Sequence, residues 1–146
     1  MPGILVGVDG STHSRRALEW AIKEAAHRHA PLTVLTVHQT YRGFWNAGVE
    51  YPGDAALVAD ARKAVQEETD EALAKFAEDA RPPEVTVLAV DGSPAEQILH
   101  TGADADMIVL GSRGAGGFAK LLLGSVASQV THHAHCPVMV IPALPD

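Results

Sequence analysis

The run Met107-Ile108-Val109-Leu110 leads directly into Gly111-Ser112-Arg113-Gly114, and nine residues later the chain reads Gly124-Ser125. The apolar run predicts a buried strand, and a helical pattern begins at Gly124. Glycine lets backbone N–H groups approach an anion, and a helix N-terminus adds unpaired N–H groups and partial positive charge. This stretch therefore predicts a binding site for nucleotide phosphates. The alternative is that the glycines form only a tight turn and a flexible loop.

Apolar runs and helical patterns alternate along the whole chain. Near-continuous apolar strands that alternate with helices predict an α/β fold, a parallel sheet with helices on both faces. Ser93-Pro94-Ala95-Glu96 has the form of a capping box at the start of a short helix. The expected strands are 4–8, 32–37, 84–90, 107–110 and 137–141, and the expected helices are 14–30, 54–80, 93 to about 100, and 124 to about 133.

Length and composition limit the classes of protein. The 146 residues carry a formal net charge of −7, which argues against nucleic acid or an anionic membrane as a partner. No apolar run approaches the roughly 20 residues that span a bilayer. The chain has one cysteine, Cys136, so it has no internal disulfide framework. We expect a single domain over residues 1–146, in a cytoplasmic protein.

Two common phosphate-binding motifs do not fit the glycines. A Walker A loop needs Gly-Lys-Ser/Thr after a first glycine and four residues, and the chain has no such string. A dinucleotide fingerprint placed on Gly114, Gly116 and Ala119 needs an acidic residue about twenty positions later. No Asp or Glu lies between Asp106 and the terminal Asp146. The same acid-free stretch suits a polyanion.

Single residues beside the motif have two possible roles each. Ligands of open α/β sheets bind beyond the carboxyl ends of strands, where both Asp9 and Gly111 fall. Asp9 could accept hydrogen bonds from ribose hydroxyls, or it could only cap a helix. Arg113 and Lys120 could contact phosphate, or they could lie in solvent.

The glycine spacing, together with Val6-Gly7-Val8-Asp9-Gly10-Ser11, resembles the ATP-binding branch of the universal stress protein family. The resemblance extends over essentially the whole chain, through Cys136-Pro137-Val138-Met139-Val140-Ile141. It implies a five-stranded parallel sheet in the order 3-2-1-4-5, a Rossmann-like fold of the adenine nucleotide α-hydrolase type.

The resemblance also implies roles for particular residues. Asp9 would bind the ribose, and the main chain of Val37 would bind the adenine edge. The ribose and phosphates would lie against Gly111, Gly114, Gly124, Ser125 and Val126. ATP would carry Mg²⁺ or Mn²⁺ on its phosphates. A homodimer would form through the last strand, at Val138, Met139, Val140 and Ile141.

Two other groups of residues are less specific. Tyr41, Phe44, Trp45 and Tyr51 lie in a long loop, 38–53, where they could cap the adenine or cover the sheet. A second group, His132, His133, His135 and Cys136, invites a metal interpretation. Histidines near a helix C-terminus are explained equally by the helix dipole, and we favour that explanation.

Three functions are compatible with these observations. The main hypothesis is an ATP-binding stress-response or signalling module with at most weak ATPase activity. The first alternative is a slow nucleotide-hydrolysing or phosphotransfer enzyme, which would need a base that the motif does not offer. The second is a nucleotide-free interaction dimer in which the loop is purely structural.

Overall fold

The computed structural model describes residues 2–39, 54–113 and 123–144. Their five strands form one parallel sheet in the order β3-β2-β1-β4-β5, as the family resemblance implies. The strands are β1 (Ile4–Val8), β2 (Leu32–Gln39), β3 (Val85–Gly92), β4 (Met107–Gly111) and β5 (Val138–Ile141). The helices are α1 (Thr12–Arg28), α2 (Asp54–Leu73), α3 (Pro94–Thr101) and α4 (Ser125–His133), with a 3₁₀ turn at Glu78–Ala80.

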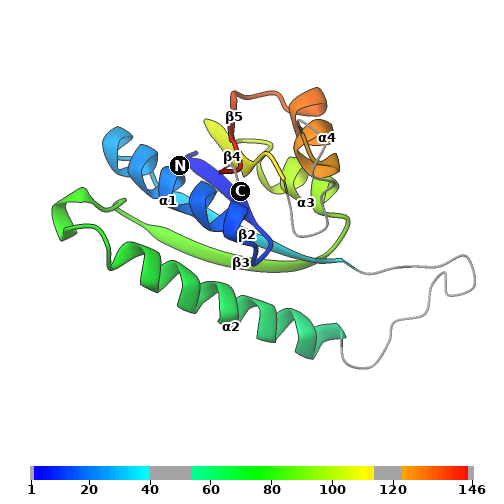
Figure 1. Cartoon of the computed structure of the whole chain (residues 1–146), viewed down its shortest axis with the longest axis horizontal. Helices are drawn as coiled ribbons and strands as arrows, with labels where there is room; N and C mark the ends of the chain where they lie inside the picture. The colour runs from blue at the N-terminus through cyan, green and yellow to red at the C-terminus, as the bar shows by residue number, and fades with distance from the viewer. Residues whose placement is uncertain (1, 40–53, 114–122, 145–146) are drawn as a thin grey trace, which may run out of the picture.

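Helices cover both faces of the sheet. Helices α1 and α2 lie on one face, and α3 and α4 lie on the other (Figure 1). Successive side chains of β1 point to opposite faces, so Ile4 and Val6 enter the core under α1 while Leu5 enters the core under α3 and α4. The sheet is therefore buried on both sides, which explains the near-continuous apolar strands.

The strand register aligns the carboxyl ends of β1, β2 and β4 at one edge of the sheet. Val8 pairs with Thr36 of β2, and Val6 pairs with Val109 of β4. Continuing both registers brings Asp9 level with Val37 on one side and with Ser112 on the other. The strand order reverses here, because β1 continues to β2 on one side while β4 lies on its other side. The carboxyl edge at this switch point is where open α/β sheets bind ligands.

The second helix is shorter than the sequence pattern predicts. It ends at Leu73 rather than Ala80, because the amides of Lys75 and Phe76 bond to carbonyls three residues back and tighten the chain into a turn. Phe76 still packs against the core under α1 and α2, so the apolar period continues past the true end. The helical period of the apolar residues in this segment also predicts that Leu57 lies on the buried face, and this prediction is wrong. Its side chain is 50% exposed, and residues 55–64 of this helix are exposed or half-buried.

Smaller corrections concern the ends of other elements. Helix α1 begins two residues earlier than predicted and ends at Arg28, because His29 takes a left-handed conformation with φ of 54°. Strands β2 and β3 each run two residues further, since they pair with one another as far as Gln39 and Gly92. Ser93 does precede α3, but its side chain makes no capping hydrogen bond.

Within the described ranges, no helix has the length and apolar character needed to cross a membrane.

Candidate nucleotide site at the carboxyl edge

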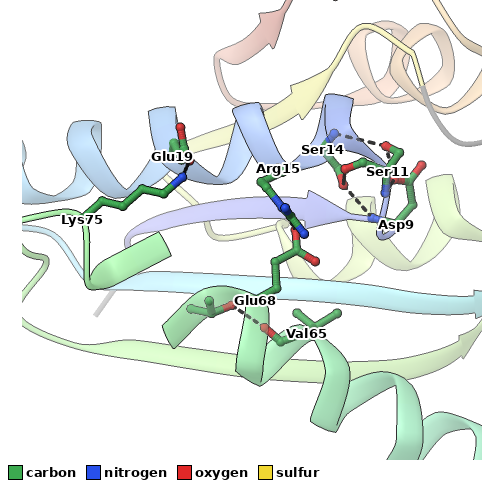
Figure 2. A network of polar contacts seen from close by, with 9 residues as sticks. Asp9, Ser11, Ser14, Arg15, Glu19, Val65, Glu68 and Lys75 are labelled. Carbon is green, nitrogen blue, oxygen red and sulfur yellow. Dashed lines mark hydrogen bonds and ion pairs between the residues drawn. The ribbon is translucent and has the colours of Figure 1, made fainter. Parts of the chain in front are cut away.

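Asp9 organises the turn between β1 and α1. Its Oδ1 accepts hydrogen bonds from the backbone N–H and the hydroxyl of Ser11, at 2.9 and 2.5 Å (Figure 2). Its own N–H donates to Ser14 Oγ at 3.2 Å. Between Asp9 and Ser11, Gly10 has φ of +83°, which glycine adopts without the steric cost that a Cβ brings. Asp9 is exposed at the edge of the sheet, and its carboxylate is held in a fixed place there.

Ser11, and not Asp9, is the N-cap of α1. The Ser11 hydroxyl oxygen accepts a hydrogen bond from the N–H of Ser14 at 3.2 Å. Buried Ser14 returns a bond from its hydroxyl to the carbonyl of Ser11 at 3.1 Å. The alternative in which Asp9 caps the helix is therefore wrong in its simple form. Asp9 instead orients Ser11, the residue that caps the helix.

The described part of the glycine motif begins at the end of β4. A Cβ on Gly111 would lie 3.2 Å from the carbonyl oxygen of His13 and 3.2 Å from that of Arg113. The first turn of α1 therefore approaches β4 closely, and only a residue without a side chain fits easily. Arg113 follows at this edge with a half-buried side chain. Gly114 lies outside the described residues.

The second part of the motif forms the start of α4. Gly124 is the N-cap, so no side chain of the cap residue shields the helix N-terminus. Its own N–H donates to the carbonyl of Ser112 at 2.6 Å, which fixes α4 against the end of β4. The N–H groups of Ser125 and Val126 belong to the first turn, which an α-helix leaves without internal partners. These amides, together with the helix dipole, provide a site for an anion.

Val37 completes the described edge. The pairing of β1 with β2 ends at Thr36, one residue before Val37, while β2 remains paired with β3 through Gln39. The structure thus brings Asp9, Val37, Arg113 and the start of α4 to one edge. The aromatic residues of 40–53 lie outside the described ranges, so their two predicted roles stay open.

Glu68 is a residue that sequence reasoning missed. The sequence places it among the charges of the solvated side of α2, yet its side chain is only 11% exposed. It points from α2 towards Arg15 of α1, with Oε1 3.7 Å from Arg15 Nε (Figure 2). Burial raises the pKa of the Glu68 carboxyl, the Arg15 charge lowers it, and the nearby charges of Asp9 and Glu71 raise it again. This carboxyl therefore lies in the electrostatic field of the Asp9 turn.

The histidine cluster has no metal-binding geometry in the part of the chain that the structure describes. No group of three or more His, Cys, Asp or Glu side chains converges there. His132 and His133 are exposed and meet edge to face, with ring centroids 5.7 Å apart. Burial raises the pKa of the Cys136 thiol, which packs against the core under α3 and α4.

Solved structures share this fold along nearly their whole length. UspA from Lactobacillus plantarum superposes with a TM-score of 0.69 at 25% identity, covering 96% of this chain and 97% of its own. A universal stress protein in complex with cAMP gives 0.68 at 27% identity, covering 97% and 96%. One from Archaeoglobus fulgidus in complex with dAMP gives 0.63 at 25% identity, covering 97% and 98%.

Sequence relatives lead to the same family. Two universal stress proteins of Mycobacterium tuberculosis are 36% and 38% identical over 155 and 149 residues, covering 98% and 95% of this chain. They are matched over only 49% and 47% of their own length, so the chain spans about half the length of these curated relatives. The model of the family described as "Universal stress protein family" matches residues 2–142. The chain therefore belongs to the universal stress protein family.

Proposed function

We propose that this chain binds an adenine nucleotide at the carboxyl edge between β1 and β4. In this proposal it is a cytoplasmic, nucleotide-dependent stress-response or signalling module, built as one domain over residues 1–146. The observation that carries the proposal is the meeting of three features at the switch point. They are the fixed carboxylate of Asp9, the glycine-lined end of β4 and the glycine-capped start of α4. Solved relatives in complex with cAMP and dAMP support the adenine nucleotide class.

Each of these features has a role in the proposal. Asp9 accepts hydrogen bonds from ribose hydroxyls, and the main chain of Val37 reads the adenine edge. Phosphates lie against the amides of Gly124, Ser125 and Val126, with Gly111 and Arg113 beside them. Gly114 joins this set on the family resemblance alone.

ATP is the proposed ligand, with Mg²⁺ or Mn²⁺ held through its phosphates. A hard divalent cation of this kind is commonly bound by substrate phosphates and a few carboxylates rather than by a dedicated protein cage. The cation adds charge neutralisation at the phosphates, while the helix dipole of α4 acts from the protein side.

Hydrolysis is expected to be slow. Rapid phosphoryl transfer needs a group that positions or deprotonates the attacking nucleophile. The chain offers no Asp or Glu between Asp106 and Asp146, so the glycine motif supplies no carboxylate for that task. The protein would then respond to nucleotide occupancy more than it turns nucleotide over.

A nucleoside monophosphate is a second candidate ligand. Two solved relatives are described with cAMP and dAMP, which carry one phosphate each. The amides of α4 can bind the phosphate oxygens of a monophosphate or of a triphosphate. Affinities measured for each nucleotide therefore decide between ATP and a nucleoside monophosphate.

The proposal also includes a homodimer through β5. This strand ends the sheet that the described residues form, since β4 is its one neighbour among their strands. Edge strands present unpaired backbone groups that pair readily with another strand. A second copy of β5 would extend the sheet across the dimer.

Calorimetric titration with ATP, ADP, AMP and cAMP, with and without Mg²⁺, tests this function. We expect saturable binding of at least one adenine nucleotide. Asp9→Asn keeps an oxygen for the Ser11 turn but removes the charge, so affinity should fall about 10-fold. Asp104→Asn is the matched control, because Asp104 is exposed and precedes β4 at the opposite edge of the sheet. Wild-type protein that binds none of these nucleotides, or equal affinities for the two variants, would refute the proposal.

A further inference from the structure

Ser112 joins three segments that are distant in sequence. Its N–H donates to the carbonyl of Ile141 at the end of β5, at 2.8 Å. Its carbonyl accepts the N–H of Gly124 at 2.6 Å, and its hydroxyl oxygen accepts the N–H of Ala143 at 3.1 Å. The residue is 6% exposed, so water does not readily replace these bonds.

The C-terminal segment, residues 142–144, is held from a second side. Arg16 of α1 donates a hydrogen bond from its guanidinium to the carbonyl of Pro142. His13, one turn earlier on the same helix, lies against Gly111. The C-terminal segment, the first turns of α1 and the end of β4 therefore form one contact region beside the candidate site. Nothing else in the function proposed above requires the segment to lie there.

We propose that Ser112 is a positioning residue that couples nucleotide binding to the order of the C-terminal segment. This inference rests on the proposed nucleotide site. The same residue fixes Gly124, whose helix would hold the phosphates, and Ala143, which belongs to the segment. A ligand that orders the start of α4 then also suppresses local opening of residues 142–144, because both are anchored on one buried residue.

The coupling is reciprocal. If nucleotide stabilises the closed C-terminal segment, release of that segment weakens nucleotide binding by the same factor. A merely structural serine would lower overall stability when replaced. It would not change how the amide of Ala143, which is 31 positions away in the sequence, responds to a ligand, and this difference makes the inference testable.

Amide exchange at Ala143 tests the coupling, measured with and without the best nucleotide from the calorimetric panel. In wild-type protein the nucleotide should slow exchange at Ala143. In Ser112→Ala this amide loses its acceptor, so ligand-free exchange should be roughly 3- to 10-fold faster. Nucleotide should then protect it no further. Ser112→Thr keeps the hydroxyl and should restore both properties.

Two further variants control for damage to the fold. Ser128→Ala is the matched change at an exposed serine of α4, and it should leave exchange at Ala143 as in wild type. Arg16→Gln removes the other tether without touching the buried serine, and it should also reduce protection by nucleotide.

The outcomes separate the two proposals. If nucleotide protects Ala143 equally in Ser112→Ala and wild type, the coupling is wrong although the nucleotide site stands. If wild-type protein binds no nucleotide, the proposed function fails and the coupling fails with it. Ligand-free exchange in Ser112→Ala against Ser128→Ala then decides whether Ser112 anchors the segment at all.

Discussion

His29 ends helix α1 in a left-handed backbone conformation that is strained for a residue with a Cβ. It has φ of 54°, and the N–H groups of His29 and Ala30 bond back to Ala26 and Ala25 in a Schellman arrangement. Glycine is the usual residue at this position because a Cβ is strained in the left-handed region. The sequence pattern predicts a helix to residue 30, directly before Pro31, and the left-handed backbone of His29 ends the helix two residues earlier.

Replacing His29 with glycine should therefore stabilise the protein. We expect His29→Gly to raise the free energy of unfolding by about 0.5–1 kcal/mol, since relief of strain exceeds the added chain entropy. His27→Gly, inside the last turn of α1, is the matched control and should lower stability by a few tenths of a kcal/mol. Urea denaturation of the three proteins measures both effects. A His29→Gly protein no more stable than wild type would contradict the expectation.

Single residues were also the hardest to predict from sequence. Asp9 and the glycines stand out because their types and spacing have few structural uses. Ser112 and Glu68 do not stand out, since their importance comes from partners 31 and 53 positions away, Ala143 and Arg15. The spacing of charged residues along α2 predicts that Glu68 lies on its polar side. Only the packing of α2 against α1 shows that the Glu68 side chain is nearly covered.

At the scale of elements, α1 meets α2 and the turn that follows α2 through charged pairs as well as apolar contacts. Glu19 and Lys75 approach to 2.6 Å at one end, and Arg15 and Glu68 approach to 3.7 Å near the Asp9 turn (Figure 2). Glu68 Oε1 is buried and accepts no hydrogen bond from the described residues. Because burial is the largest influence on it, the charged form of Glu68 is less favourable in the folded protein than in the unfolded chain.

This carboxyl should make stability depend on pH. A carboxyl pKa that folding raises above 4.5 favours folding fully below that value, and the benefit is lost as pH rises through the folded pKa. The neutral isostere Glu68→Gln should therefore be more stable than wild type at pH 7, by about 0.5–1 kcal/mol. The difference should vanish as pH falls below 4.5.

Denaturation of Glu68→Gln and wild type between pH 4 and 8 measures this effect. Glu67→Gln is the matched control, because Glu67 is exposed on the same helix and should give nearly equal stability at every pH. A Glu68→Gln protein that is less stable than wild type at pH 7 would mean that the attraction to Arg15 outweighs burial.

Most elements were predictable because they follow short-range rules. Double burial makes the strands apolar, and Pro31 and Pro82-Pro83 separate neighbouring elements. The end of α2 escaped prediction because Phe76 keeps the apolar period while the backbone has already turned. The side-chain capping bond that the pattern at Ser93 predicts is missing, because the sequence form of a capping box does not determine the side-chain rotamer.

At the scale of the whole molecule, the sheet has an edge at β5. The carbonyl of Pro137 accepts a hydrogen bond from the N–H of Ile108 in β4, and that of Ile141 accepts one from the N–H of Ser112, the residue after β4. The backbone N–H and C=O groups of successive residues point to opposite sides of a strand. The main chain of Met139 therefore also faces β4, whereas that of Val140 faces away from the sheet. The strand order itself came from the family resemblance, because alternation of strands and helices allows several orders.

The proposed dimer can be tested through this alternation. Val140→Pro removes an N–H that points away from the sheet, a position where edge strands tolerate proline. We expect it to abolish dimerisation and to keep the fold. Met139→Pro removes an N–H that faces β4, and it should destabilise the protein by about 3 kcal/mol or more. Sedimentation equilibrium and circular dichroism distinguish these results, and a wild-type protein that is monomeric at micromolar concentration would exclude the dimer.

The central claim is that an adenine nucleotide binds at the switch point between β1 and β4. The most direct measurement is a map of backbone amide chemical-shift changes in the ¹⁵N-labelled protein during titration with ATP and Mg²⁺. The account predicts saturable shifts concentrated at Asp9 to Ser11, Val37, Arg113 and Gly124 to Val126. The absence of saturable shifts there, or shifts confined to another face of the sheet, would contradict it.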